Sequence, residues 1–169
     1  MAKLVAFYSR AGENYFGGEK RYVKVGNTEK VARMIAEAAG ADLFRIEQKE
    51  PYAADYATCV EQAKKDFLEQ ARPEILGNPE SMGEYDEIYL GFPSYCGTMP
   101  MAVFTFLEKY DWTGKKIYPF VTHEGSGFGR SEKDLGTACA GAEIGTGLSI
   151  VGSKADDAGT EVERWLTIL

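Results

Sequence analysis

The chain has 169 residues, 44% of them hydrophobic, and its 26 acidic side chains outnumber 19 basic ones to give a net charge of −7. This length and hydrophobic content predict one domain, residues 1–169, and the acidic balance argues against nucleic acid or an anionic membrane as partner, since both attract clustered lysine and arginine. No apolar run reaches the roughly 20 residues that span a bilayer, and the N-terminus leads into a strand without a signal-peptide pattern, so we expect a cytoplasmic protein.

The first predicted element is a buried strand at residues 3–9, which ends at Ser9-Arg10. The next is a helix that opens at Gly26-Asn27-Thr28. Its apolar face consists of Val31, Met34, Ile35 and Ala38. Residues 11–25 lie between the strand and the helix and are called the insertion below.

The end of this strand and the start of this helix together form a seat for a phosphate group. The first N–H groups of a helix have no partner within it and lie at the positive end of the helix dipole, where they attract anions. The lysine of a nucleotide-triphosphate loop is missing, and no G-x-G-x-x-G follows the strand. The residues therefore predict a monophosphate held mainly by neutral donors.

Strand and helix patterns alternate along the rest of the chain. The predicted strands are 42–47, which is half-buried like an edge strand, 85–91, 116–122 and 148–151. The predicted helices include 57–70, in which Val60, Ala63 and Phe67 face inward, and two helices at 131–139 and 156–169. A further helix is capped by Thr98 and has Pro100 in its first turn. Its inward-facing residues are Val103, Phe104 and Leu107. Cys59, Cys96 and Cys139 are far apart and form no C-x-x-C motif, which indicates reduced thiols and no zinc site.

This alternation predicts an α/β fold, in which five parallel strands are covered by helices on both faces as a three-layer α/β/α sandwich. In such sheets, ligands bind at the carboxyl edge of the strands, where the strand order reverses. The loops after the first, third and fourth strands are rich in glycine, hydroxyl and aromatic residues. We therefore expect the ligand at these three loops.

These loops resemble those of one known family. They contain Ser9-Arg10 with Gly26-Asn27-Thr28, the run Gly-Phe-Pro-Ser-Tyr-Cys-Gly-Thr-Met-Pro at 91–100, and the run Thr-His-Glu-Gly-Ser-Gly-Phe-Gly at 122–129. Together they are similar to flavodoxins, and more narrowly to the bacterial flavodoxin-like group with an insertion in its phosphate loop. The resemblance spans the whole chain and implies a flavodoxin-like fold with strand order 2-1-3-4-5, bound FMN, and electron transfer. The chain departs from the group at Tyr95-Cys96, where an aromatic pair is common.

The resemblance implies that the FMN phosphate is held by Ser9, Arg10, Asn27 and Thr28, together with the backbone N–H groups of Gly26 and Glu29. From the residues alone, Asn27 and Thr28 are also ordinary helix caps. Arg10 is open to two interpretations, a phosphate contact or a solvated loop residue.

By the same resemblance, the flavin ring contacts the loop after the third strand, at Pro93, Ser94, Tyr95, Cys96, Gly97 and Thr98. Tyr95 is the best candidate to lie against the face of the ring. A glycine peptide turns over without Cβ strain, so Gly97 could offer its carbonyl to the N5–H of a reduced flavin. Cys96 fits a packing residue better than a redox-active thiol, because no base neighbours it in the sequence.

The loop after the fourth strand completes the predicted site with His123, Glu124, Gly125, Ser126, Gly127, Phe128 and Gly129. Its glycines allow close backbone approach and supply N–H donors to the pyrimidine edge of the flavin, and a flexible loop is the alternative. His123 is the only histidine. It lacks partners at metal-ligand spacing, which favours a ring-edge contact or a loop anchor over a base or a metal ligand. We predict no catalytic residue and no metal site.

The insertion is aromatic and rich in glycine over residues 14–22. It could cover the cofactor, dimerise, or receive a partner or substrate. A surface excursion without function is also open, because long loops cost little closure entropy. We favour a cover on the flavin side, formed by Asn14 and Tyr15.

Three function classes follow. The first is a small FMN electron carrier, a monomer or weak homodimer that serves redox partner proteins, because the chain has no nicotinamide-binding domain. The second is an FMN-dependent NAD(P)H or quinone reductase of the same fold. The third, a phospho-receiver domain, needs acidic residues after the first strand and an aspartate after the third, where this chain has Tyr8-Ser9 and Leu90-Gly91.

Overall fold

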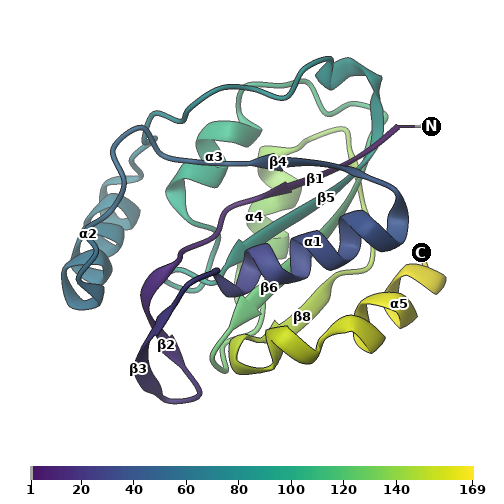
Figure 1. Cartoon of the computed structure of the whole chain (residues 1–169). Coiled ribbons are helices and arrows are strands. Elements are labelled where there is room, and N and C mark those ends of the chain that lie inside the picture. The colour runs from purple at the N-terminus through teal and green to yellow at the C-terminus, as the bar shows by residue number, and fades with distance from the viewer. Residues whose placement is uncertain (1) are drawn as a thin grey trace.

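The computed structural model describes residues 2–169, and its centre is a parallel sheet of six strands (Figure 1). The strands are β1 (Ala2–Phe7), β4 (Asp42–Arg45), β5 (Tyr85–Pro93), β6 (Lys116–His123), β7 (Glu143–Ile144) and β8 (Leu148–Val151). Their order is β4-β1-β5-β6-β7, and β8 also pairs with β6. This confirms the predicted order 2-1-3-4-5, with β4 as the edge strand.

The predicted fifth strand is divided in two. β7 pairs with the start of β6, where Ile144 lies opposite Ile117, and β8 pairs with its end, where Leu148 lies opposite Phe120. The short β7 was not predicted, because two residues are too few to show a periodic pattern.

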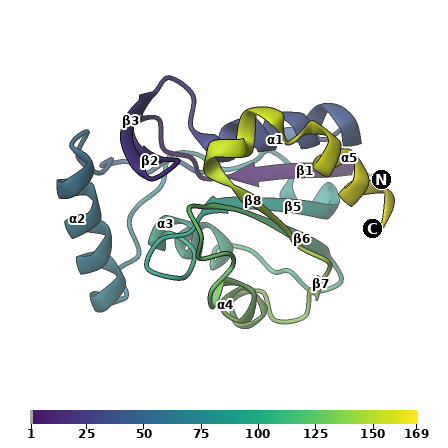
Figure 2. The ribbon, with the colours of Figure 1, turned by 90° about the horizontal axis from the view of Figure 1, so that it is seen from below.

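Helices cover both faces of the sheet (Figure 2). α1 (Asn27–Ala39) and α5 (Gly159–Thr167) lie on one face, and α3 (Met101–Leu107) and α4 (Ser131–Ala138) lie on the other. Two short 3-10 helices, η1 (Met82–Glu84) and η2 (Gly152–Asp157), precede β5 and α5. The three-layer α/β/α architecture is therefore confirmed.

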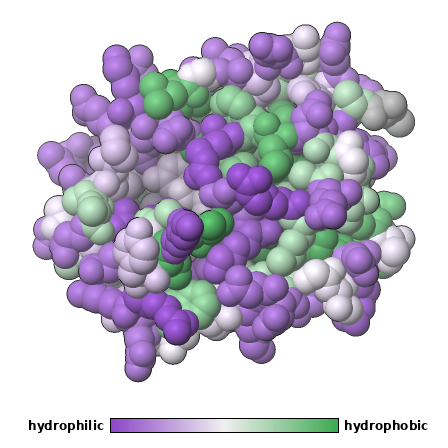
Figure 3. Space-filling model, viewed as in Figure 1, coloured by the Kyte–Doolittle hydropathy of each residue, from purple (hydrophilic) through white to green (hydrophobic). Residues whose placement is uncertain are grey.

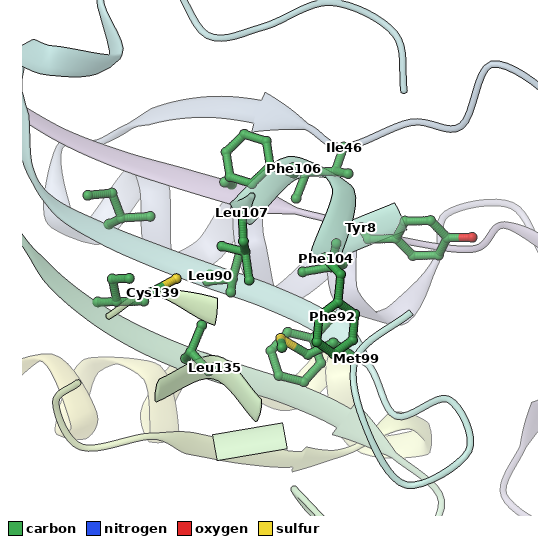
Figure 4. Packing of buried hydrophobic residues seen from close by; sticks show 14 of the residues in the cluster. Tyr8, Ile46, Leu90, Phe92, Met99, Phe104, Phe106, Leu107, Leu135 and Cys139 are labelled. Atoms are coloured by element: carbon green, nitrogen blue, oxygen red, sulfur yellow. The ribbon is translucent and has the colours of Figure 1, made fainter. Parts of the chain in front are cut away.

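Each face of the sheet has its own hydrophobic core. On the α3 and α4 side, Leu90, Phe106 and Leu135 pack together (Figure 4). On the α1 and α5 side, the core contains Val31 and Ile35 as predicted, together with Ala32 and Ala36. Ala38 is exposed, so its predicted place on the buried face of α1 was wrong.

The start of α3 also differs from the prediction. Pro100 occupies the N-cap position, and no side chain caps this helix. The hydroxyl of Thr98 instead donates to Asp134 on α4, at 2.5 Å. Val103, Phe104 and Leu107 are buried, as expected.

α2 (Tyr56–Glu69) does not cover the sheet. It stands beyond the carboxyl ends of the strands in both views (Figures 1 and 2). Only Cys59 and Ala63 are buried in it, and Val60, which was predicted to face inward, is 45% exposed. The apolar spacing of α2 was interpreted correctly as helical, but it faces a different surface.

The insertion is an antiparallel hairpin of β2 (Gly12–Phe16) and β3 (Glu19–Val23). It lies at the same end of the molecule as α2 (Figure 2). Gly17 and Gly18 form the turn with φ angles of 66° and 90°, as a type I′ hairpin turn requires.

The face of the molecule seen in Figure 3 is mostly hydrophilic, with hydrophobic residues in separate patches. Across residues 2–169, none of the helices combines the length and the apolar character needed to cross a membrane.

Candidate cofactor site

A cavity of about 450 Å³ opens at the carboxyl ends of β1, β5 and β6, where the sequence predicted the ligand. It is bounded by the start of α1, the loops after β5 and β6, the hairpin and α2. The predicted residues that line it are Arg10, Asn14, Tyr15, Asn27, Thr28, Pro93, Ser94, Tyr95, Cys96, His123, Glu124, Gly125 and Ser126. Contact with a cofactor stays a prediction for each of them.

The N-terminus of α1 lies beside Ser9 and Arg10, as the predicted phosphate seat requires. The backbone N–H of Glu29 donates to the hydroxyl of Ser9 at 3.1 Å, so this N–H, which was expected to face a phosphate, is already paired. The N–H groups of Asn27 and Thr28, in the same first turn, have no acceptor within the helix. At Gly26, a Cβ would meet the carbonyl oxygen of Arg10 at 2.5 Å, so only glycine allows this close approach.

Polar side chains surround this helix end. The hydroxyls of Thr28 and Thr122 lie 2.7 Å apart, and both residues are buried. The side-chain oxygen of Asn27 is buried and finds no hydrogen-bond partner among residues 2–169. A Cβ on Gly152 would lie 2.6 Å from the side-chain nitrogen of Asn27, so the absence of a side chain there keeps this amide free of steric conflict. Together, these groups offer a polar lining with unused donor and acceptor capacity.

Arg10 is not simply a solvated loop residue, and its contact with a phosphate stays a prediction. Its guanidinium donates to the carbonyl of Glu13 at 3.1 Å and to that of Ala54 at 2.9 Å. It thus connects the hairpin to the segment before α2, while it also lines the cavity. Its remaining N–H groups are still available to a ligand, because a guanidinium carries five donors.

The loop after β5 is a tight turn. Tyr95 and Thr98 exchange both backbone hydrogen bonds, at 2.9 and 3.0 Å, and Cys96 and Gly97 between them have φ angles of 53° and 77°. This is the pattern of a two-residue type I′ turn. The carbonyl of Gly97 accepts the backbone N–H of Arg130 at 2.8 Å. Turning this peptide over toward a reduced flavin would break that hydrogen bond, and the predicted offer of the carbonyl stays a prediction.

Cys96 is exposed in this turn, so its expected role as a packing residue was wrong. Partial burial raises the pKa of its thiol, and burial likewise raises the pKa of Cys59 and brings that of Cys139 to about 12. All three thiols are protonated at neutral pH, which argues against a reactive thiolate.

Tyr95 packs edge-on against Tyr8, with ring centroids 5.9 Å apart. Its hydroxyl is buried without a partner in the described part of the chain, whereas the Tyr8 hydroxyl donates to Gln48 at 2.6 Å. Burial raises the pKa of both phenols far above neutrality, so both stay neutral. Figure 4 shows the Tyr8 ring pointing away from the labelled core residues.

His123 anchors its loop, one of the two roles predicted for it. Its Nδ1 accepts the N–H of Gly125 at 2.8 Å, and its Nε2 lies 2.8 Å from the hydroxyl of Ser149. Because Nδ1 is an acceptor, Nε2 carries the proton and donates to Ser149. The imidazole is therefore committed to neighbours on both sides. Nowhere in residues 2–169 do three or more histidine, cysteine or acidic side chains gather as a metal site would need.

Seven predicted residues lie outside the cavity lining. They are Ser9, Gly26, Gly97, Thr98, Gly127, Phe128 and Gly129. Ser9 and Gly26 support the lining from behind, as described above. Phe128 packs against the core on the α3 and α4 side, and Gly129 lies against the carbonyl of Gly97. The far half of the loop after β6 thus belongs to the scaffold of the site.

Six lining residues were missed: Tyr56, Cys59, Val60, Ala63, Thr122 and Gly152. Of the four on α2, Val60 and Ala63 were predicted to face inward from the helix, whereas Tyr56 lies just before the predicted start of the helix and Cys59 was given no role in it. Thr122 directly precedes His123 at the end of β6, so its position could have been inferred. Gly152 carried no signal, because its role depends on the distant Asn27.

Comparison with known proteins agrees with this geometry. The profile of a family described as Flavodoxin matches residues 20–168, which begins within the hairpin. No curated protein matched the chain significantly.

Solved structures share the fold over nearly the whole chain. A candidate flavoprotein from Bacteroides uniformis is 27% identical, with 98% of this chain and 97% of that chain covered and a TM-score of 0.79. A Lactobacillus acidophilus flavoprotein in complex with FMN is 19% identical, with 98% of each chain covered and a TM-score of 0.66. A Fusobacterium nucleatum flavodoxin bound to flavin mononucleotide is 14% identical, with 99% and 96% covered and a TM-score of 0.56. Because the family match covers most of its length, the chain belongs to the flavodoxin family.

Proposed function

We propose that the protein binds FMN in this cavity and transfers electrons between redox partners. One observation carries the proposal: in a member of the flavodoxin family, the open N-terminus of α1 and an aromatic turn after β5 line the same cavity. The first is a site for a phosphate, and the second is a surface for a flat ring.

The residues of the cavity fit FMN. A phosphate accepts hydrogen bonds only, and the seat offers the free N–H groups of Asn27 and Thr28, the Asn27 amide and the Thr28 hydroxyl. The unpartnered Asn27 oxygen and Tyr95 hydroxyl match a ligand with donors and acceptors of its own. A volume of about 450 Å³ lies in the range of small-molecule sites.

The relatives support the same cofactor. The Lactobacillus acidophilus and Fusobacterium nucleatum proteins carry FMN, and each covers nearly the whole of this fold. FMN, when bound, would supply one- and two-electron chemistry. The chain's own part is to anchor the phosphate at α1, to orient the ring with the loops after β5 and β6, and to limit its contact with water.

An FMN-dependent reductase of small molecules is the second candidate. The hairpin and α2 both line the cavity and thus add walls at its mouth. A wall of this kind favours exchange with a small molecule such as a quinone over exchange with a protein surface.

The visible spectrum of the purified protein and titration with FMN test the proposal. We expect FMN to bind tightly and riboflavin, which lacks the phosphate, at least about 100-fold more weakly, because each hydrogen bond to a charged group contributes about 1.5–3 kcal/mol. A protein that takes up no FMN would contradict the proposal. Steady-state turnover with NAD(P)H and quinone would separate a reductase from a carrier.

A further inference from the structure

A polar and an aromatic contact with the hairpin hold the first residue of α2 in place. Of its 14 residues, Cys59 and Ala63 are buried, and Phe67 packs against the core on the α3 and α4 side. At its first residue, the N–H of Tyr56 donates to the carboxylate of Glu13 at 2.8 Å. Arg10 joins the carbonyls of Glu13 and Ala54, and the rings of Tyr15 and Tyr56 meet at 5.1 Å between centroids. We call these contacts of Arg10, Glu13 and Tyr15 the clamp.

The clamp orients α2 so that one of its faces lines the cavity. Tyr56, Cys59, Val60 and Ala63 all line it, and they stand at positions i, i+3, i+4 and i+7 of the helix. None of the four carries a charge at neutral pH. A stripe of this spacing normally packs against a protein core, yet Val60 is left 45% exposed here. Within the stripe, Val60 therefore lacks a covering partner in the fold, whereas Cys59 and Ala63 are buried.

We propose that this α2 face packs against the apolar ring system of the bound flavin, and that the clamp holds it there. The proposal rests on the proposed function. The polar end of the cavity, at Asn27 and Thr28, suits the phosphate, so the ring system is the part of FMN left for the end lined by α2.

A matched pair of substitutions on α2 tests the contact directly. Val60→Asp and Leu68→Asp each place a carboxylate on an exposed apolar position of the same helix, but only Val60 lines the cavity. We expect Val60→Asp to weaken FMN binding about tenfold or more, because a charge is desolvated against the ring, and Leu68→Asp to leave it unchanged. Thermal unfolding of the FMN-free variants checks that both fold.

The clamp is tested with the thiols as reporters, without any cofactor. Cys59 lies on the inward face of α2 and is 3% exposed, whereas Cys139 lies in the core on the α3 and α4 side and is 1% exposed. We expect Glu13→Ala to speed alkylation of Cys59 about tenfold and to leave Cys139 unchanged, as read by mass spectrometry. Glu13→Gln keeps an acceptor for the Tyr56 N–H and should restore slow labelling. Glu19→Ala, at the exposed tip of the hairpin, is the control.

FMN itself provides the third readout. In the wild type, saturating FMN should slow the alkylation of Cys59 about tenfold without affecting Cys139, and Glu13→Ala should weaken FMN binding about tenfold.

The outcomes separate the two proposals. If the wild type binds no FMN, the proposed function fails, while the thiol experiment still tests the clamp. If FMN binds but leaves Cys59 unprotected and tolerates Val60→Asp, the proposed contact with α2 is wrong and the proposed function stands. Equal acceleration of Cys59 and Cys139 in Glu13→Ala would mean general destabilisation and would overturn the clamp.

Discussion

Glu29 is a buried carboxylate beside the predicted phosphate seat, where an unbalanced negative charge would repel an anion. It is 8% exposed, in the first turn of α1. Its oxygens accept hydrogen bonds from Arg33, at 2.9 and 2.8 Å, and from Arg45 on β4. Burial alone would raise the pKa of this carboxyl, but the two arginines outweigh burial and lower the pKa. The ion pairs thus neutralise Glu29 and attach the start of α1 to the edge of the sheet.

Glu29→Gln should therefore lower the free energy of unfolding at neutral pH by about 1–2 kcal/mol. Because the folded-state pKa lies below the unfolded value of about 4.3, the stabilisation is complete above that value and is lost as the pH falls through the folded pKa. The difference between wild type and variant should shrink between neutral pH and a pH of about 3 in urea unfolding curves. Glu37→Gln, exposed on the same helix, serves as the control. A difference that stays constant with pH would contradict this account.

At the scale of elements, the sheet and its covering helices were predictable because their burial is periodic. β1, β5 and β6 are apolar runs with buried residues on both faces, and α1 repeats apolar residues at helical spacing up to Gly40, which ends it in the left-handed conformation. These signals are local, so the sequence alone carries them.

The hairpin and the position of α2 were not predictable in the same way. β2 mixes polar and aromatic residues and is half-buried except at Tyr15, and β3 is exposed except at Val23, so neither shows the pattern of a core strand. The stripe that contains Val60 has the spacing of any core-facing helix, and spacing does not say which surface it faces. That information lies in long-range contacts, such as Glu13 with the Tyr56 N–H across 43 positions of the chain.

The site was predictable only as far as strand ends define it. Ser94 and His123 follow directly from the ends of β5 and β6, and both line the cavity. Gly97 and Phe128 lie in the same loops but do not line the cavity, because the geometry of each turn determines which loop residues face a ligand. The left-handed φ angles at Cys96 and Gly97 define one such turn, and a cysteine in the sequence does not indicate a left-handed backbone conformation.

Gly129 connects the loops after β5 and β6. It has a φ of 53°, and a Cβ there would collide with the carbonyl of Gly97. Gly129→Ala should therefore cost about 1–3 kcal/mol of stability, from backbone strain and from the displaced turn at Cys96. Gly136→Ala is a matched control inside α4, where a Cβ meets open space, and it should stabilise by up to about 1 kcal/mol. Urea unfolding measures both, and equal effects of the two substitutions would contradict the close approach.

At the scale of the whole molecule, the two cores share the strands that separate them. In β1, Leu4 and Ala6 belong to the core on the α3 and α4 side, whereas Val5 and Phe7 belong to the other. Ile117 and Tyr118 of β6 divide in the same way. Neither core can unfold without disrupting strands on which the other core also depends. We therefore expect residues 1–169 to unfold as one cooperative unit, as the predicted single domain requires.

The two tryptophans allow each core to be observed separately. Trp112 is 2% exposed in the core on the α3 and α4 side, and Trp165 is 4% exposed in the core on the α1 and α5 side. In Trp165→Phe, fluorescence reports only Trp112, and in Trp112→Phe it reports only Trp165. Each substitution removes one hydrogen bond from the indole to a backbone carbonyl, so midpoints are compared within a variant, between fluorescence and far-UV circular dichroism. Shared strands predict coincident urea midpoints in both variants, whereas a core that melts first would separate the two signals in one of them.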